Sequence, residues 1–135
     1  MQKPSTKELF IGSLERCSKS KRYMPTFYHR FLSISDDIGD KFRHTNFEHQ
    51  NQMLLHSLRL AAYVAAGQPE ALRELRERAM THDRRHLNIE PRLYDLWRAS
   101  LIETSRQFDD QWDEDIEKAW YTVLEHVISY MVKHY

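Results

Sequence analysis

The feature that most restricts the fold of this chain is the helical spacing of its apolar residues, which is clearest between positions 45 and 67. Thr45 and Glu48 form a capping-box pair, and Gly67 suits the C-terminal cap of a helix that ends just before it. Between these caps, one helical face carries Phe47, Gln50, Leu54, Leu58, Ala61 and Ala65. A long helix with one apolar face requires partners that cover this face.

The rest of the chain follows the same pattern. Ser5 and Glu8 form a second capping pair, and Pro25, Pro69 and Pro91 stand where further helices are expected to begin. The last helix is predicted to bury Ile116, Ala119, Trp120, Val123, Val127 and Tyr130. Strand-like alternation is almost absent, and the chain has only three glycines and four prolines. We therefore predict an all-α protein that forms a single domain over residues 1–135, a length that can bury a substantial core.

The charge balance excludes several classes of partner. The 20 basic residues are matched by 20 acidic ones, and no basic run is interleaved with aromatic residues, so we expect neither nucleic acid nor a membrane as partner. No apolar run approaches the ~18 residues that a spanning helix needs, and the N-terminus lacks a signal-like apolar core. The single cysteine, Cys17, fits a reducing compartment. We expect a cytoplasmic protein.

Two histidines occupy the apolar side of the charged segment after Pro69. The stripe that begins at Leu72 and Leu75 continues through Ala79 to His82 and His86. Most histidines of soluble helices are surface or hydrogen-bonded core residues, and that ordinary role stays open here. The pair lacks the glutamate of a zinc protease motif. One imidazole can, however, hold a haem iron, provided that an apolar slot exists. Candidate walls for such a slot are Phe42, Leu54, Leu58, Leu75, Trp97 and Leu101.

The order of several short motifs resembles the globins, most closely the bacterial single-domain globins and the haem domain of flavohaemoglobins. The motifs are "TFYHRFL", Phe42, "QNQML", "THDRRHLNIEP", "YDLW" and "KAWYTVLEHVISYM". They cover nearly the whole chain, and their order and spacing are more specific than any one of them. The resemblance implies a globin fold of seven to eight helices packed around haem b (iron protoporphyrin IX).

Carried over by position, the resemblance implies roles for individual residues. His82 matches the proximal iron ligand, and Phe42 matches the phenylalanine that packs on the porphyrin. His86 is similar to a histidine that contacts a haem propionate, although an ordinary exposed histidine is nearly as consistent with the sequence. Tyr94 corresponds to a residue behind the proximal ring. Tyr135 stands where flavohaemoglobins carry a glutamate, and this departure weakens the case for strongly oxidative chemistry.

On the opposite side of the haem, Tyr28 matches a distal tyrosine, and Gln50 with Leu54 one turn later matches the distal glutamine and its apolar neighbour. Gln52 is an alternative to Gln50, but its helical neighbours are polar, and His49 is a further alternative. The implied function is reversible binding of dioxygen, NO and CO, for oxygen transport or gas sensing, by a monomer or homodimer. The alternatives are an NO dioxygenase that works with a separate reductase and a haem-free globin-fold signalling module.

Overall fold

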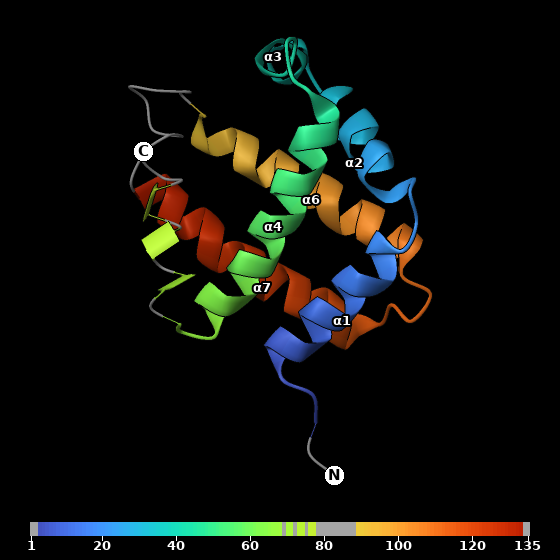
Figure 1. The fold of residues 1–135 in the computed structure, drawn as a ribbon, viewed down its shortest axis with the longest axis vertical. Coiled ribbons are helices and arrows are strands. Elements are labelled where there is room, and N and C mark those ends of the chain that lie inside the picture. Colours follow the sequence, from blue (N-terminus) through green and yellow to red (C-terminus); the bar gives the residue numbers. More distant parts are fainter. Residues whose placement is uncertain (1–2, 69, 72, 75, 78–88, 134–135) are drawn as a thin grey trace.

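The computed structural model is entirely helical over the residues it describes, and Figure 1 shows how the helices are arranged. The described residues are 3–68, 70–71, 73–74, 76–77 and 89–133. The helices with complete bounds are α1 (Thr6–Ser18), α2 (Tyr23–Leu32), α3 (Asp36–Lys41), α4 (Phe47–Ala65), α6 (Pro91–Phe108) and α7 (Glu114–Lys133).

The all-α prediction is therefore confirmed, but the predicted number of helices is not. Six helices with complete bounds occur in the described part of the chain, whereas seven to eight were expected. The segment between α2 and α4, which was expected to be a turn, forms the six-residue helix α3. The described residues between 70 and 77 are also helical, as predicted for the segment after Pro69. No helix in the described residues is long and apolar enough to cross a membrane.

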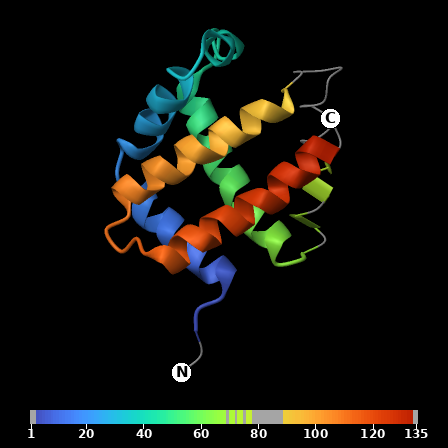
Figure 2. The same ribbon diagram turned by 180° about the vertical axis from the view of Figure 1, so that it is seen from behind.

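The helices cross one another in two layers. Figure 2 shows α6 and α7 side by side on one face, and Figure 1 shows α4 crossing them on the other. Helix α1 packs mainly on α7, α2 packs on α6, and α4 packs on α7. The core between them contains the most deeply buried large side chains: Phe10, Leu14, Tyr23, Phe27, Ile38, Leu58, Leu101, Trp120, Val123 and Leu124.

Both ends of α4 have capping interactions, which agrees with the capping residues seen in the sequence at these positions. The N-cap is Asn46, whose side chain accepts a hydrogen bond from the His49 amide at 3.2 Å, so the cap lies one residue after the predicted Thr45. At the other end Gly67 has a φ of +81°, as predicted for a C-terminal cap. Its amide donates to the Val64 carbonyl, and the next amide donates to Tyr63, which completes a Schellman motif.

The starts of the other helices agree with the predictions to within two residues. Ser5 caps α1 by accepting a hydrogen bond from the Glu8 amide at 3.1 Å. Pro91 is the first residue of α6, where its missing N–H costs nothing. Helix α2 begins at Tyr23 rather than Pro25, because a proline is tolerated anywhere in a first turn whose amides have no helical partner.

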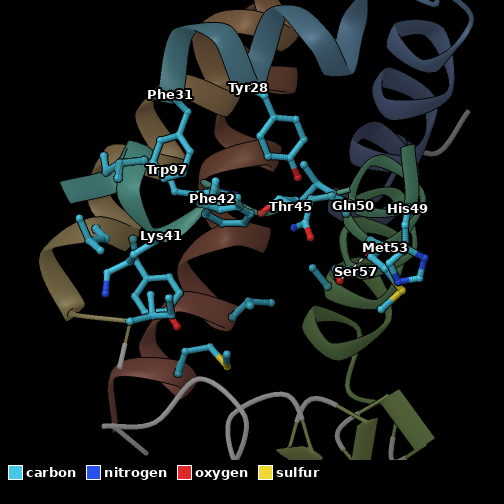
Figure 3. Close-up of a pocket in the computed structure, with 18 of the residues that line it drawn as sticks. Tyr28, Phe31, Lys41, Phe42, Thr45, His49, Gln50, Met53, Ser57 and Trp97 are labelled. Atoms are coloured by element: carbon cyan, nitrogen blue, oxygen red, sulfur yellow. Dashed lines mark hydrogen bonds between the residues drawn. The ribbon is translucent and has the colours of Figure 1, made fainter. Parts of the chain in front are cut away.

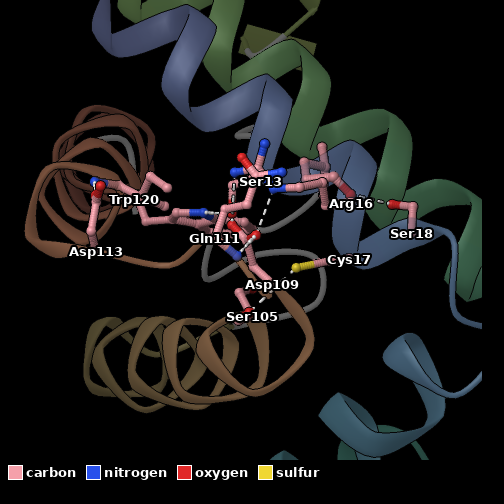
Figure 4. A network of polar contacts seen from close by, with 11 residues as sticks. Ser13, Arg16, Cys17, Ser18, Ser105, Asp109, Gln111, Asp113 and Trp120 are labelled. Carbon is pink, nitrogen blue, oxygen red and sulfur yellow. Dashed lines mark hydrogen bonds and ion pairs between the residues drawn. The ribbon is translucent and has the colours of Figure 1, made fainter.

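An ion pair joins α1 to the turn between α6 and α7 (Figure 4). Arg16 donates to both carboxylate oxygens of Asp109, at 2.5 and 3.0 Å, and the Asp109 side chain is fully buried. Burial alone would raise the pKa of Asp109, but hydrogen bonds from Arg16, Ser13 and the Gln111 amide outweigh it and hold this pKa below its usual value. Asp109 therefore stays ionised inside the protein and fixes the turn to α1.

Buried hydroxyl and thiol groups continue this network between α1, α2 and α6. The hydroxyl groups of Tyr23 and Ser105 are hydrogen-bonded at 2.6 Å, and the Cys17 thiol donates to the Ser105 carbonyl at 3.4 Å. Burial raises the pKa of Cys17 to about 12, so the thiol remains protonated. These contacts satisfy polar groups of the core and give Cys17 a structural role.

Candidate functional site

A cavity of about 600 Å³ opens between α2, α3, α4, α6 and α7 (Figure 3). Most of its wall is apolar or aromatic. The lining residues are Tyr28, Phe31, Ile38, Lys41, Phe42, Thr45, His49, Gln50, Met53, Leu54, Ser57, Leu60, Ala61, Ile89, Leu93, Tyr94, Trp97, Val127 and Met131. Among these are Tyr28, Phe42, Gln50, Leu54, Tyr94 and Trp97, which sequence analysis selected from four separate segments.

Tyr28 reaches the cavity from α2. Its side chain is almost completely buried, and Figure 3 shows the hydroxyl group directed toward Gln50. Burial raises the pKa of Tyr28 to about 12, and a hydrogen bond with the Gln50 side chain offsets part of this increase. The phenol is therefore neutral at ordinary pH and keeps a proton that it can donate.

An aromatic cluster holds Tyr28 and Phe42 in position. The Phe42 ring lies 6.0 Å from the Tyr28 ring and 6.1 Å from Phe31, measured between centroids. Phe47, the first residue of α4, lies 5.3 Å from Tyr28 and 6.4 Å from Phe42. Such edge and stacked contacts stabilise aromatic pairs beyond their burial alone. The cluster ties α2 and the end of α3 to the first turn of α4.

One face of α4 supplies the polar and apolar groups of the adjoining wall. Gln50 and Leu54 lie one turn apart, and Ala61 continues the same face two turns later. His49 also lines the cavity but is exposed, whereas Gln52 is exposed and lies outside the lining. Of the two glutamines that the sequence leaves as alternatives, Gln50 is thus the one at the cavity.

Helix α6 forms another wall. Tyr94 and Trp97 are three residues apart, so both side chains face the cavity from the same side of the helix. Burial raises the pKa of Tyr94 to about 12, so this phenol is also neutral. Leu93, one residue earlier, is buried and completes this part of the lining.

Several candidates from sequence analysis cannot be placed in this site. His82, His86, Leu72, Leu75, Ala79 and Tyr135 lie outside the described residues. Within the described part of the chain, no three His, Cys, Asp or Glu side chains gather as metal ligands.

Other lining residues were not selected from the sequence. Ser57 shares the α4 face of Gln50, Leu54 and Ala61 but is polar and gives no apolar signal, whereas Leu60 faces the cavity from beside that face. Lys41 and Thr45 belong to the segment around α3, whose short length left no periodic signal. Met131 near the end of α7 could have been found from its spacing to Val127, which is one turn earlier.

A comparison with solved structures finds a similar protein with the same fold. The chain superposes with a TM-score of 0.91 on a protein from Pseudomonas aeruginosa PAO1 that is described as structurally highly homologous to a human haemoglobin. The two sequences are 28% identical, and the match covers 97% of this chain and 98% of the other. No family model matches the chain, and no curated protein does. The chain is therefore a globin-like protein of the bacterial single-domain type.

Proposed function

We propose that this cavity holds haem b and that the chain binds dioxygen, NO and CO there. The observation that carries the proposal is one cavity of about 600 Å³ in which two hydrogen-bonding side chains, Tyr28 and Gln50, meet above apolar walls. This volume lies within the range of small-molecule and cofactor pockets, and it occurs in a globin-like fold.

The residues of the cavity fit a flat, mostly apolar ring. Phe42 and Trp97 offer aromatic surfaces, and Leu54, Ala61 and Met131 offer aliphatic ones. Their burial on the porphyrin would stabilise the complex through the hydrophobic effect. The iron would take its protein ligand from His82, which the resemblance to globins selects and which lies outside the described residues.

A haem bound in this cavity would supply an iron that can bind a diatomic gas. Tyr28 and Gln50 determine which gas is held best, because each can donate a hydrogen bond into the cavity. Dioxygen held beside Tyr28 and Gln50 would carry partial negative charge that these donors can stabilise, whereas CO would carry little. In a cavity that excludes water, fixed donors stabilise such charge strongly. We expect the pair to favour dioxygen over CO.

A haem titration tests the proposal. The purified chain should saturate at about one haem per chain, with a sharp Soret band that shifts when the reduced protein takes up CO. Ala61→Phe would fill the cavity and should weaken haem binding. Ala99→Phe, on the exposed side of α6, is the matched control. Circular dichroism would show that both variants fold. A broad, unsaturable band, or equal binding by the two variants, would contradict the proposal.

A further inference from the structure

Three aromatic rings confine the side chain of Tyr28. Its ring centroid lies 4.9 Å from that of Phe27, 5.3 Å from Phe47 and 6.0 Å from Phe42, and the three rings are inclined to it by 57° to 65°. Contacts of this kind depend on the relative orientation of the rings as well as on their burial. They therefore restrict the rotation of Tyr28 about its side-chain bonds and fix the direction of its hydroxyl group.

The three rings differ in their position relative to the cavity. Phe42 lines the cavity and Phe27 is completely buried in the core, so replacing either would change the binding surface or the core itself. Phe47 is only half-buried and is not among the residues that line the cavity. Any effect of Phe47 on a bound molecule must therefore pass through a neighbouring residue.

Phe47 has a fixed place at the start of α4. The preceding residue, Asn46, caps the helix by accepting a hydrogen bond from the His49 amide at 3.2 Å. The Phe47 ring stacks on Phe42, with the two ring planes 21° apart. Gln50 follows three residues after Phe47, so both side chains leave α4 on the same side of the helix. Phe47 thus contacts the first of the two cavity donors and is a helical neighbour of the second.

We infer that Phe47 is a positioning residue: its ring keeps the hydroxyl group of Tyr28 directed into the cavity beside Gln50, and thereby increases the preference for dioxygen over CO. The inference rests on the proposed function and deepens it, because it assigns a role in ligand selectivity to a residue outside the cavity. Without the Phe47 ring, Tyr28 would have free space on one side, and its phenol would adopt more than one orientation. A donor that is not fixed stabilises a partly anionic ligand less well.

The first test follows the orientation of Tyr28 and needs no gas-release measurement. The full chain, with isotope-labelled tyrosine rings, is kept reduced under CO so that any haem is diamagnetic. Nuclear Overhauser effects between the Tyr28 ring and the side-chain amide of Gln50 should be present in wild type and weaker in Phe47→Leu. Phe47→Tyr keeps the ring and should resemble wild type. Phe108→Leu is the matched control, because Phe108 is also half-buried and packs edge-on against a tyrosine, Tyr23, away from the cavity.

The second test follows ligand release from the haem-loaded protein. Phe47→Leu should speed dioxygen release about twofold to tenfold, the range that the loss of one aromatic pair predicts, and should change CO release much less. In the double variant Tyr28→Phe/Phe47→Leu, dioxygen should leave at the rate of Tyr28→Phe alone, because Phe47 acts through the hydroxyl group. Phe47→Tyr and Phe108→Leu should release both gases like wild type.

The outcomes separate this inference from the proposed function. Circular dichroism would show that the variants fold. The inference is wrong, and the proposed function stands, if Phe47→Leu leaves either the Overhauser effects or the dioxygen rate at the wild-type value. The same holds if Phe47→Leu speeds the release of both gases equally, or still speeds dioxygen release when the Tyr28 hydroxyl is absent. If the Overhauser effects change as expected but wild type takes up no haem, Phe47 positions Tyr28 as inferred, while the proposed function and the selectivity role are wrong.

Discussion

The hydroxyl group of Tyr28 on α2 is directed toward the side chain of Gln50 on α4 at the wall of the cavity, where Gln50 lowers the pKa that burial of the phenol raises. The contact joins two helices, and the rings of Phe42 and Phe47 pack beside it. The two donors are therefore positioned before any ligand enters. A gas ligand that accepts a hydrogen bond would find a fixed pair, which requires little reorganisation when it binds.

Replacing Gln50 tests whether the two donors act together. In the haem-loaded protein, Gln50→Leu should speed dioxygen release, because it removes one donor and frees Tyr28 from its partner. The double variant Tyr28→Phe/Gln50→Leu should show less than the summed effect of the single changes, since the pair forms one network. Stopped-flow rates of dioxygen dissociation from wild type, the two single variants and the double variant give the coupling free energy between Tyr28 and Gln50. Strict additivity would show that the two side chains act independently on the bound ligand.

His82→Ala tests the iron ligand expected from the sequence. Loss of the only expected protein bond to iron should abolish stable haem retention, and added imidazole should restore part of it. His126→Ala, on the exposed face of α7, should retain haem like wild type. Haem content after gel filtration and the ferrous absorption spectrum are the measurements. Unchanged haem content and an unchanged spectrum in His82→Ala would exclude this assignment.

The buried ion pair between Arg16 and Asp109 predicts a pH-dependent contribution to stability. Asp109→Asn leaves Arg16 without its carboxylate and should lower the free energy of unfolding at neutral pH by roughly 2 to 4 kcal/mol, less than for a fully buried pair because Arg16 is partly exposed. The pKa of Asp109 is lowered by folding, so this stability is present above the unfolded pKa of about 3.9. It disappears as the pH falls through the lower pKa of the folded state.

Urea unfolding at several pH values measures this difference. Wild type and Asp109→Asn should converge as the pH falls below about 4. Asp110→Asn changes the neighbouring, exposed carboxylate and should have little effect at any pH. A constant gap between wild type and Asp109→Asn down to the acid transition would show that lost packing, rather than lost charge, causes the destabilisation.

Gly67 provides a test of the helix-capping interpretation. Gly67→Ala should destabilise the protein by about 1 kcal/mol, because alanine is strained at a positive φ. A methyl group there would meet no atom within 4 Å, so the whole cost comes from the backbone. Gly12→Ala within α1 should instead stabilise, since alanine is the better helix former and its methyl would meet only Arg16 Nη1, at an ordinary contact distance of 3.4 Å. The midpoint temperatures of thermal unfolding of both variants, compared with that of wild type, test these two predictions.

The parts of the fold that the sequence predicts well are those with strong local signals. The capping residues Ser5 and Gly67 and the opening Pro91 are found where the helix rules put them. The short helix α3 was expected only as a turn, because six residues are too few to show a period. The N-cap of α4 was misplaced by one residue because Thr45 and Asn46 are both good capping residues, and only the backbone geometry separates them.

The helical spacing of the residues predicts which side chains share a face of a helix, but not that these faces line one cavity. Gln50 and Leu54 share a stripe on α4, and Tyr94 and Trp97 share one on α6, so each pair was predictable. That these pairs face one cavity with Tyr28 depends on how α2, α4 and α6 cross, which is a property of tertiary packing. Only the resemblance to globins indicates from the sequence that these residues share one site.

The most direct test of the account is the rate at which dioxygen and CO leave the haem-loaded Tyr28→Phe variant. A hydrogen bond to a ligand with partial negative charge contributes on the order of 1.5 to 3 kcal/mol. Its loss should speed dioxygen release roughly tenfold to a hundredfold. CO release should change far less, and Tyr121→Phe, at an exposed position, should change neither rate. If the rates of both gases change in Tyr28→Phe by the same factor, Tyr28 is only a steric wall and the proposed role of its hydroxyl group is wrong.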